Sequence, residues 1–141
     1  MKLKKLVAVV AIAALAMLPC QSASAASVIF SNFSYTSTPN WEAWKKVTRK
    51  TKADNEQNWY VTLTDSAGLS TTKCRAMFNS STTNNSLHPR SAPVPLYKNT
   101  TRCVQSYYIY TPKGSDCKLY IHGDENAKVS YTVKVSGRYT S

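Results

Sequence analysis

The stretch Asn58-Trp59-Tyr60-Val61-Thr62-Leu63-Thr64-Asp65 decides the fold class of this chain. Its odd-numbered positions from 59 to 63 are large and apolar, whereas the even-numbered positions between and after them are Tyr or Thr. A period of two, built from aromatic and β-branched residues, is typical of a strand that buries one face. Turn-forming polar residues bracket the stretch at 54–58 and 65–68. The sequence therefore predicts a half-buried β-strand around which the rest of the chain is arranged.

Comparable stretches follow along the chain and are separated by turn-forming residues. The predicted strands cover residues 28–35, 45–53, 71–79, 102–110, 117–122 and 128–135. Residues 94–97 are expected to form a short edge piece, because Pro95 has no backbone N–H to donate. With about seven or eight short strands and no convincing helix, we expect one all-β domain, an antiparallel β-sandwich or barrel-like fold.

The segment 41–47 fits two interpretations. Trp41, Trp44 and Val47 are three residues apart, as on one side of a helix, whereas residues 46–53 alternate as in a strand. We favour a strand at 45–53, paired through the turn at 54–58 with the Trp59 strand. That pairing would place a basic strand at or near a sheet edge, where lysines also discourage aggregation.

The first 25 residues have the pattern of a cleaved export signal. A basic start with Lys2, Lys4 and Lys5 precedes thirteen apolar residues at 6–18, and Ala23-Ser24-Ala25 matches a cleavage site. Thirteen residues fall short of the ~20 that a membrane-spanning helix needs. We therefore predict a signal peptide at 1–25, cleavage after Ala25, a secreted domain at 26–141 and no transmembrane segment. A lipidated Cys20 is disfavoured by the preceding Pro19.

The chain is basic, with 18 Lys and Arg against 7 Asp and Glu and a formal net charge of +11. Three of these charges belong to the export signal, which leaves about +8 on the secreted domain. This balance favours an anionic wall polymer or cell surface as partner, although charge also keeps secreted proteins soluble. Export argues against nucleic acid. The candidate binding residues are basic side chains of the 45–52 stretch and two tyrosines: Lys45, Lys46, Arg49, Lys50, Lys52, Tyr108 and Tyr110.

Three cysteines remain after the signal: Cys74, Cys103 and Cys117. If residues 111–116 form a tight hairpin, Cys103 and Cys117 lie about 23 Å apart along the strand direction at ~3.3 Å per residue. A disulfide needs its Cα atoms within ~7 Å. Either remaining pairing includes Cys74. We favour a Cys74–Cys117 disulfide, because both cysteines lie on apolar faces of their predicted strands, with three reduced thiols as the alternative.

No catalytic or metal motif is apparent. His88 lies in the long 80–93 loop and His122 at the end of a strand, where we expect a surface position. The acidic residues fall mostly in turns, and the ligand spacings of zinc and calcium sites are missing, as are phosphate-loop and Gly-x-Ser-x-Gly motifs. We expect no cofactor, no metal and no enzyme activity, and keep an enzyme site in the His88 loop as a third hypothesis.

With these residues laid out, the chain resembles a family of small secreted Gram-positive bacterial proteins of unknown function. The resemblance rests on the Ala-rich signal, the basic strand, the Trp59 strand and the ending Val133-Lys134-Val135-Ser136-Gly137-Arg138. It departs from the family in its three cysteines and in Arg138-Tyr139, where a Trp would be expected after the glycine. The resemblance implies no catalytic residues. The chain is also similar in kind to small exported bacteriocins of the lactococcin type.

These observations predict an exported, non-enzymatic β-sandwich protein that binds an anionic cell-envelope or extracellular partner. The alternative is a bacteriocin-like secreted antibacterial protein. The sequence leaves the oligomeric state undetermined.

Overall fold

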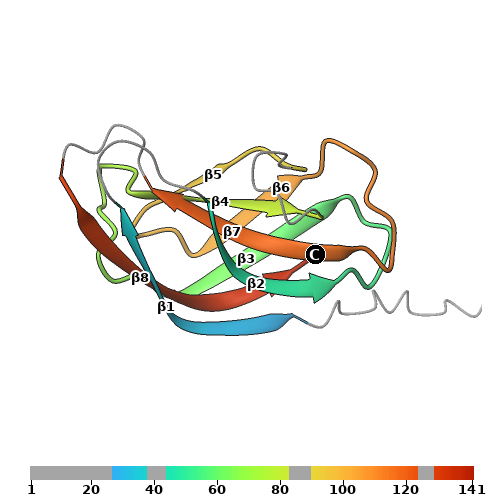
Figure 1. Cartoon of the computed structure of the whole chain (residues 1–141), viewed down its shortest axis with the longest axis horizontal. Helices are drawn as coiled ribbons and strands as arrows, with labels where there is room; N and C mark the ends of the chain where they lie inside the picture. The colour runs from blue at the N-terminus through green and yellow to red at the C-terminus, as the bar shows by residue number, and fades with distance from the viewer. Residues whose placement is uncertain (1–26, 38–43, 83–89, 124–128) are drawn as a thin grey trace, which may run out of the picture.

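A computed structural model describes residues 27–37, 44–82, 90–123 and 129–141. Within these ranges the chain is all-β, as the sequence predicted, and forms eight strands (Figure 1). The strands are β1 (Val28–Ser37), β2 (Lys45–Thr51), β3 (Asn58–Asp65), β4 (Ala76–Ser81), β5 (Val94–Leu96), β6 (Arg102–Ser106), β7 (Asp116–Gly123) and β8 (Tyr131–Thr140). The predicted signal peptide and its cleavage site after Ala25 lie outside the described residues.

The strands form two antiparallel four-stranded sheets that pack face to face as a β-sandwich (Figure 1). The order is β1-β8-β3-β6 in the first sheet and β2-β7-β4-β5 in the second. No helix within the described ranges is long and apolar enough to cross a membrane.

The core lies between the two sheets and contains the apolar face of β3, since Trp59, Val61 and Leu63 are all buried. The first sheet adds alternate residues of β1 and β8, and the second adds those of β4 and β7. Phe30 and Phe78 meet across the core edge to face, with ring centroids 6.2 Å apart. The alternation that predicted β3 therefore reflects its burial in the sandwich.

The predicted pairing of the basic strand with the Trp59 strand is wrong. β2 pairs with β7 at the edge of the second sheet, whereas β3 lies between β6 and β8 in the first. The segment between β2 and β3 carries the chain from one sheet to the other. At this crossing Lys52 N–H donates to the Ser115 carbonyl at 2.9 Å, and Gly114 N–H donates to the Lys52 carbonyl at 2.9 Å.

The predicted hairpin across residues 111–116 is also wrong, because β6 and β7 belong to different sheets. β6 ends at Ser106, and the following residue, Tyr107, makes an isolated bridge to Ser91. The chain then leaves the first sheet and crosses to the start of β7. β4 likewise begins at Ala76, so residues 71–75 precede the strand that was predicted to include them.

Candidate functional site

The predicted basic residues of β2 do not form one surface. Lys46 and Arg49 are exposed, and Lys50 is partly buried. The Lys45 ammonium lies 5.4 Å from the centroid of the Tyr35 ring. A bulge between Lys46 and Thr48 further interrupts the alternation of the strand.

Lys52 lies in the interior, contrary to its expected place among the charges that contact a ligand. Its side chain has 0% exposure, and its Nζ lies 3.4 Å from an Asp54 carboxylate oxygen. The ammonium is also 5.6 Å from the centroid of the Tyr107 ring. Its role is therefore structural, at the crossing between the sheets.

Tyr108 and Tyr110, the two predicted aromatic candidates, are exposed together with Ile109. We call residues 108–110 the aromatic loop. The three side chains are 67%, 54% and 65% exposed, respectively. Exposing three consecutive large side chains with apolar surface to water is unfavourable. Such exposed patches are therefore uncommon and usually mark a binding surface.

The backbone around the aromatic loop is held by hydrogen bonds on both sides. Tyr107 N–H donates to the Gln57 carbonyl at 2.8 Å, and Tyr108 N–H donates to the Arg90 carbonyl at 2.7 Å. On the far side, Thr111 N–H donates to Gln57 Oε1 at 2.8 Å, and Gln57 Nε2 donates to the Thr111 carbonyl at 3.2 Å. These hydrogen bonds restrain the backbone on both sides of the loop, which lowers the entropy that binding would cost.

A second feature, which the sequence reasoning missed, is the outer side of the first sheet. Arg138 on β8 and Arg102 on β6 both pair in register with Thr62 on β3, which lies between them. Two strand spacings place their Cα atoms about 9.5 Å apart. Lys134 shares the exposed side of β8. We call Arg102, Arg138, Lys134 and Tyr60 the cationic face.

Tyr60 joins the two kinds of side chain on this face. The Arg102 guanidinium lies 5.1 Å from the centroid of the Tyr60 ring, a cation–π contact. The Tyr60 hydroxyl donates to the Glu56 carboxylate, and this hydrogen bond raises the pKa of the phenol. The signal that could have revealed the face is alternation, because Lys134 and Arg138 fall between the buried residues of β8.

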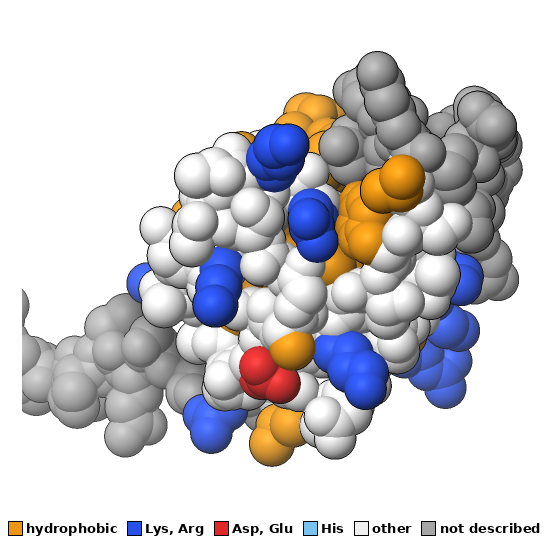
Figure 2. Space-filling view, turned by 90° about the vertical axis from the view of Figure 1, so that its left-hand side faces the viewer, with side chains coloured by type: hydrophobic (Ala, Val, Ile, Leu, Met, Phe, Trp, Pro, Cys, Tyr) orange, Lys and Arg blue, Asp and Glu red, His pale blue; other side chains and the backbone are white. Residues whose placement is uncertain are grey.

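Among the residues that the structure describes, the exposed cations have no acidic partner. Within the described ranges the ion pairs are Lys52–Asp54 and Lys118–Asp116, and both lysines are buried. Figure 2 shows the end of the sandwich away from the aromatic loop, where Lys and Arg side chains are spread over the surface with little acidic surface between them. The positive charge is therefore distributed over the surface, and the cationic face is distinguished by the Tyr60 ring beside its arginines.

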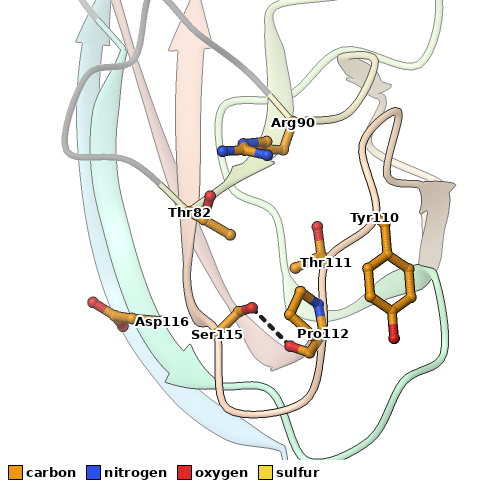
Figure 3. A pocket seen from close by; sticks show the side chains of 7 residues that line it. All are labelled: Thr82, Arg90, Tyr110, Thr111, Pro112, Ser115 and Asp116. Carbon is orange, nitrogen blue, oxygen red and sulfur yellow. Dashed lines mark hydrogen bonds between the residues drawn. The ribbon is translucent and has the colours of Figure 1, made fainter.

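A pocket of about 210 Å³ lies beside the aromatic loop (Figure 3). Its lining comes from the end of β4, the segment before β5 and the loop leading into β7. The lining residues are Thr82, Arg90, Tyr110, Thr111, Pro112, Ser115 and Asp116. Tyr110 thus belongs both to the exposed aromatic loop and to the pocket.

His122 is buried, contrary to the expected surface position. Its ring lies 4.9 Å from that of Trp44, centroid to centroid, and its Nδ1 is 2.7 Å from the Gly123 carbonyl. No group of three or more His, Cys, Asp or Glu side chains suited to a metal ion occurs in the part of the chain that the structure describes. His88 and its predicted loop site fall in residues 83–89, outside that part.

Cys74, Cys103 and Cys117 are thiols, and the predicted Cys74–Cys117 disulfide is not formed. Cys74 lies outside the strand predicted to align it, and its Sγ donates to the Ala76 carbonyl at 3.3 Å. Cys117 faces the core, as does Cys103, where burial raises the pKa of the Cys103 thiol to about 11. A thiol with so high a pKa is a poor nucleophile at neutral pH.

No protein-family model, curated protein or solved structure matches this chain.

Proposed function

We propose that this protein is exported and binds an anionic cell-envelope polymer through its cationic face and aromatic loop, without chemical conversion of the ligand. The proposal rests on one observation. Arg102, Arg138 and Lys134 are exposed on the cationic face and form no ion pair with an acidic side chain among the described residues. Two guanidinium groups on the strands that flank β3 can contact successive anionic groups of an extended chain.

The two parts of the surface have different roles in this proposal. Charge supplies attraction that acts over about 10 Å at ordinary ionic strength and is screened by salt. The aromatic loop supplies short-range contact with the apolar faces of the polymer, as tyrosines do at many recognition surfaces. The loop leads on from β6, the strand that carries Arg102, so the polymer can meet both along one edge of the first sheet.

The experiment measures retention of purified protein on isolated wall and intact cells over a salt series. We expect the double variant Arg102→Gln/Arg138→Gln to be retained about twofold to thirtyfold more weakly at low salt, given ~0.2–1 kcal/mol for each of the two exposed charge contacts. The matched control is Lys73→Gln/Lys98→Gln, which removes the same charge from exposed positions outside the strands of this face. Equal weakening in both double variants would mean that net charge, and no particular face, causes retention. No retention of the natural protein at low salt would refute envelope binding.

N-terminal sequencing of the protein recovered from culture medium tests the export half of the proposal. The expected mature sequence begins Ala26-Ser27-Val28. Recovery of an intact Met1 or of a lipid-modified Cys20 would contradict it.

The exposed apolar loop also favours the second candidate, a bacteriocin-like protein that acts on the membranes of competing cells. Tyr108, Ile109 and Tyr110 on an exposed loop of a basic protein suit insertion at an anionic lipid surface. Dye release from phosphatidylglycerol vesicles, abolished by Ile109→Ser, would support this function. Retention on wall without dye release would favour the first.

A further inference from the structure

One arginine of the cationic face, Arg102, is held by a neighbouring side chain. Its guanidinium carbon lies over the Tyr60 ring, 5.1 Å from the ring centroid. Among the described residues this guanidinium forms no ion pair and no hydrogen bond. An arginine that contacts the face of an aromatic ring keeps N–H groups at its edge, which can bind an oxyanion. Arg102 is therefore ordered by the ring while its donors remain available.

The Tyr60 ring is itself held in place by the Glu56 carboxylate. The Tyr60 hydroxyl donates to Glu56 Oε1, and Asn58 Nδ2 donates to the same oxygen at 3.3 Å. Asn58 is fixed in turn, because Ser106 Oγ on β6 donates to Asn58 Oδ1 at 2.7 Å. These hydrogen bonds determine the direction of the ring that contacts Arg102.

The backbone at Glu56 is bonded on both sides. Its N–H donates to Asp54 Oδ1 at 2.9 Å, and the carbonyl of the next residue, Gln57, accepts from Tyr107 N–H at 2.8 Å. The Glu56 side chain is exposed beside the cationic face. A carboxylate at this position repels anionic ligands at long range, so any contribution that it makes to binding has to come through its contacts.

We propose that Glu56 is a positioning residue of the cationic face. Through the Tyr60 hydroxyl its carboxylate holds the ring against the Arg102 guanidinium, and the edge of this guanidinium binds one carboxylate or phosphate group of the ligand. Ordering a flexible arginine before the ligand arrives strengthens binding by about twofold to tenfold. This inference rests on the proposed function and identifies the side chains that prepare its anion contact.

The experiment compares two substitutions that remove the same charge. Glu56→Gln keeps an oxygen that can accept from the Tyr60 hydroxyl, whereas Glu56→Ala does not. Loss of the negative charge alone would strengthen anion binding equally in both variants. We expect Glu56→Gln to bind about twofold to tenfold more tightly than Glu56→Ala. Isothermal titration calorimetry of the purified protein with inorganic polyphosphate and with poly-glutamate, at one low salt concentration, measures the difference.

Two second-site variants test whether the effect passes through the ring to the arginine. Tyr60→Phe removes the hydroxyl and Arg102→Gln removes the guanidinium, so in either background the two Glu56 variants should bind alike. Asp65→Asn and Asp65→Ala are the matched control pair. Asp65 is exposed at the other end of β3, and its Oδ1 accepts from Ser66 N–H. These two control variants should bind within twofold of each other.

A second measurement needs no ligand. In the NMR spectrum of the natural protein and of Glu56→Gln, the ring current of Tyr60 should shift the Nε–H signal of Arg102. In Glu56→Ala this signal should return toward that of an exposed arginine without an aromatic neighbour. An unchanged signal in Glu56→Ala would show that the ring does not depend on Glu56 and would reject the positioning role.

Equal binding of Glu56→Gln and Glu56→Ala would overturn the inference, as would a difference of the same size in the Tyr60→Phe or Arg102→Gln background. Failure of the natural protein to bind either polyanion would also overturn it. The proposed function fails separately. If the Glu56 variants differ as expected but the natural protein is not retained on isolated wall, envelope binding is refuted and the positioning role stands. Retention on wall with equal binding of the two variants refutes the positioning role alone.

Discussion

At the scale of single residues, Lys52 illustrates how a buried charge is tolerated. Its ammonium is fully enclosed, and the structure offers it Asp54 at 3.4 Å and the face of the Tyr107 ring at 5.6 Å. Removing one partner of such a pair leaves the other charge uncompensated, whereas removing the charge itself can be nearly neutral. The two partners should therefore respond differently to substitution.

We expect Asp54→Asn to lower the free energy of unfolding by about 1–3 kcal/mol, less than for a fully buried pair because Asp54 is a third exposed. Lys52→Met should change it by less than about 1 kcal/mol, because its stem still packs in the core. Urea denaturation of both variants gives the comparison. In Asp54→Asn the side-chain amide oxygen can still accept the hydrogen bond from Glu56 N–H, so the turn stays intact. A larger loss in Lys52→Met than in Asp54→Asn would contradict this account.

At the scale of elements, Gln57 determines how firmly the aromatic loop is held. Its side-chain amide bridges the Thr111 backbone, with Thr111 N–H donating at 2.8 Å and Nε2 donating to the Thr111 carbonyl at 3.2 Å. Gln57→Ala should cost about 1 kcal/mol of stability for the lost hydrogen bonds. It should also speed hydrogen exchange at Thr111 and weaken retention on wall. The Tyr107 N–H should stay protected, because it donates to the backbone carbonyl of Gln57. Unchanged exchange at Thr111 would contradict this role.

Alternation predicted the existence of β3 and β8, because it records which side chains face the core. It could not predict pairing, since a strand such as β3 presents the same pattern whether its neighbour is β2 or β6. The basic stretch was assigned one surface because its charges are contiguous in sequence. In the structure these charges divide between the two faces of β2, and Lys52 is buried at the crossing between the sheets.

The residues of the candidate site also differ in whether the sequence alone could identify them. Tyr108 and Tyr110 could be selected from sequence, because tyrosine on both faces of a stretch implies exposure. The pocket beside the loop could not be predicted from sequence. It forms only in the fold, where Tyr108 N–H donates to the Arg90 carbonyl and residues 111–116 approach from another part of the chain. Arg102 and Arg138 likewise meet only through the register of β3.

At the scale of the whole molecule, a buried polar network joins the two sheets. Ser80 Oγ on β4 lies 2.7 Å from the Tyr139 hydroxyl on β8 and 2.9 Å from the Tyr107 hydroxyl, which follows β6. Burial raises the pKa of both phenols above the ordinary value of 10.0 and that of the Cys103 thiol from 9.0 to about 11. These groups are protonated in the folded core and ionise more easily when the chain unfolds.

The protein should therefore lose stability in alkali. Below pH 9 the Cys103 thiol is protonated in both the folded and the unfolded chain, and its contribution to stability is complete. That contribution falls as pH rises from 9 to about 11, because the thiol ionises first in the unfolded chain. At about 1.4 kcal/mol for each pKa unit, the loss approaches 2–3 kcal/mol, and Tyr107 and Tyr139 add to it above pH 10. The urea midpoint should be level from pH 7 to 8.5 and then decline. In Cys103→Ala the decline should begin about one pH unit later, since the phenols then ionise first. A urea midpoint that stays level to pH 11, or a decline in Cys103→Ala identical to that of the natural protein, would contradict this account. Either result would show that ionisation of these buried groups does not determine stability in alkali.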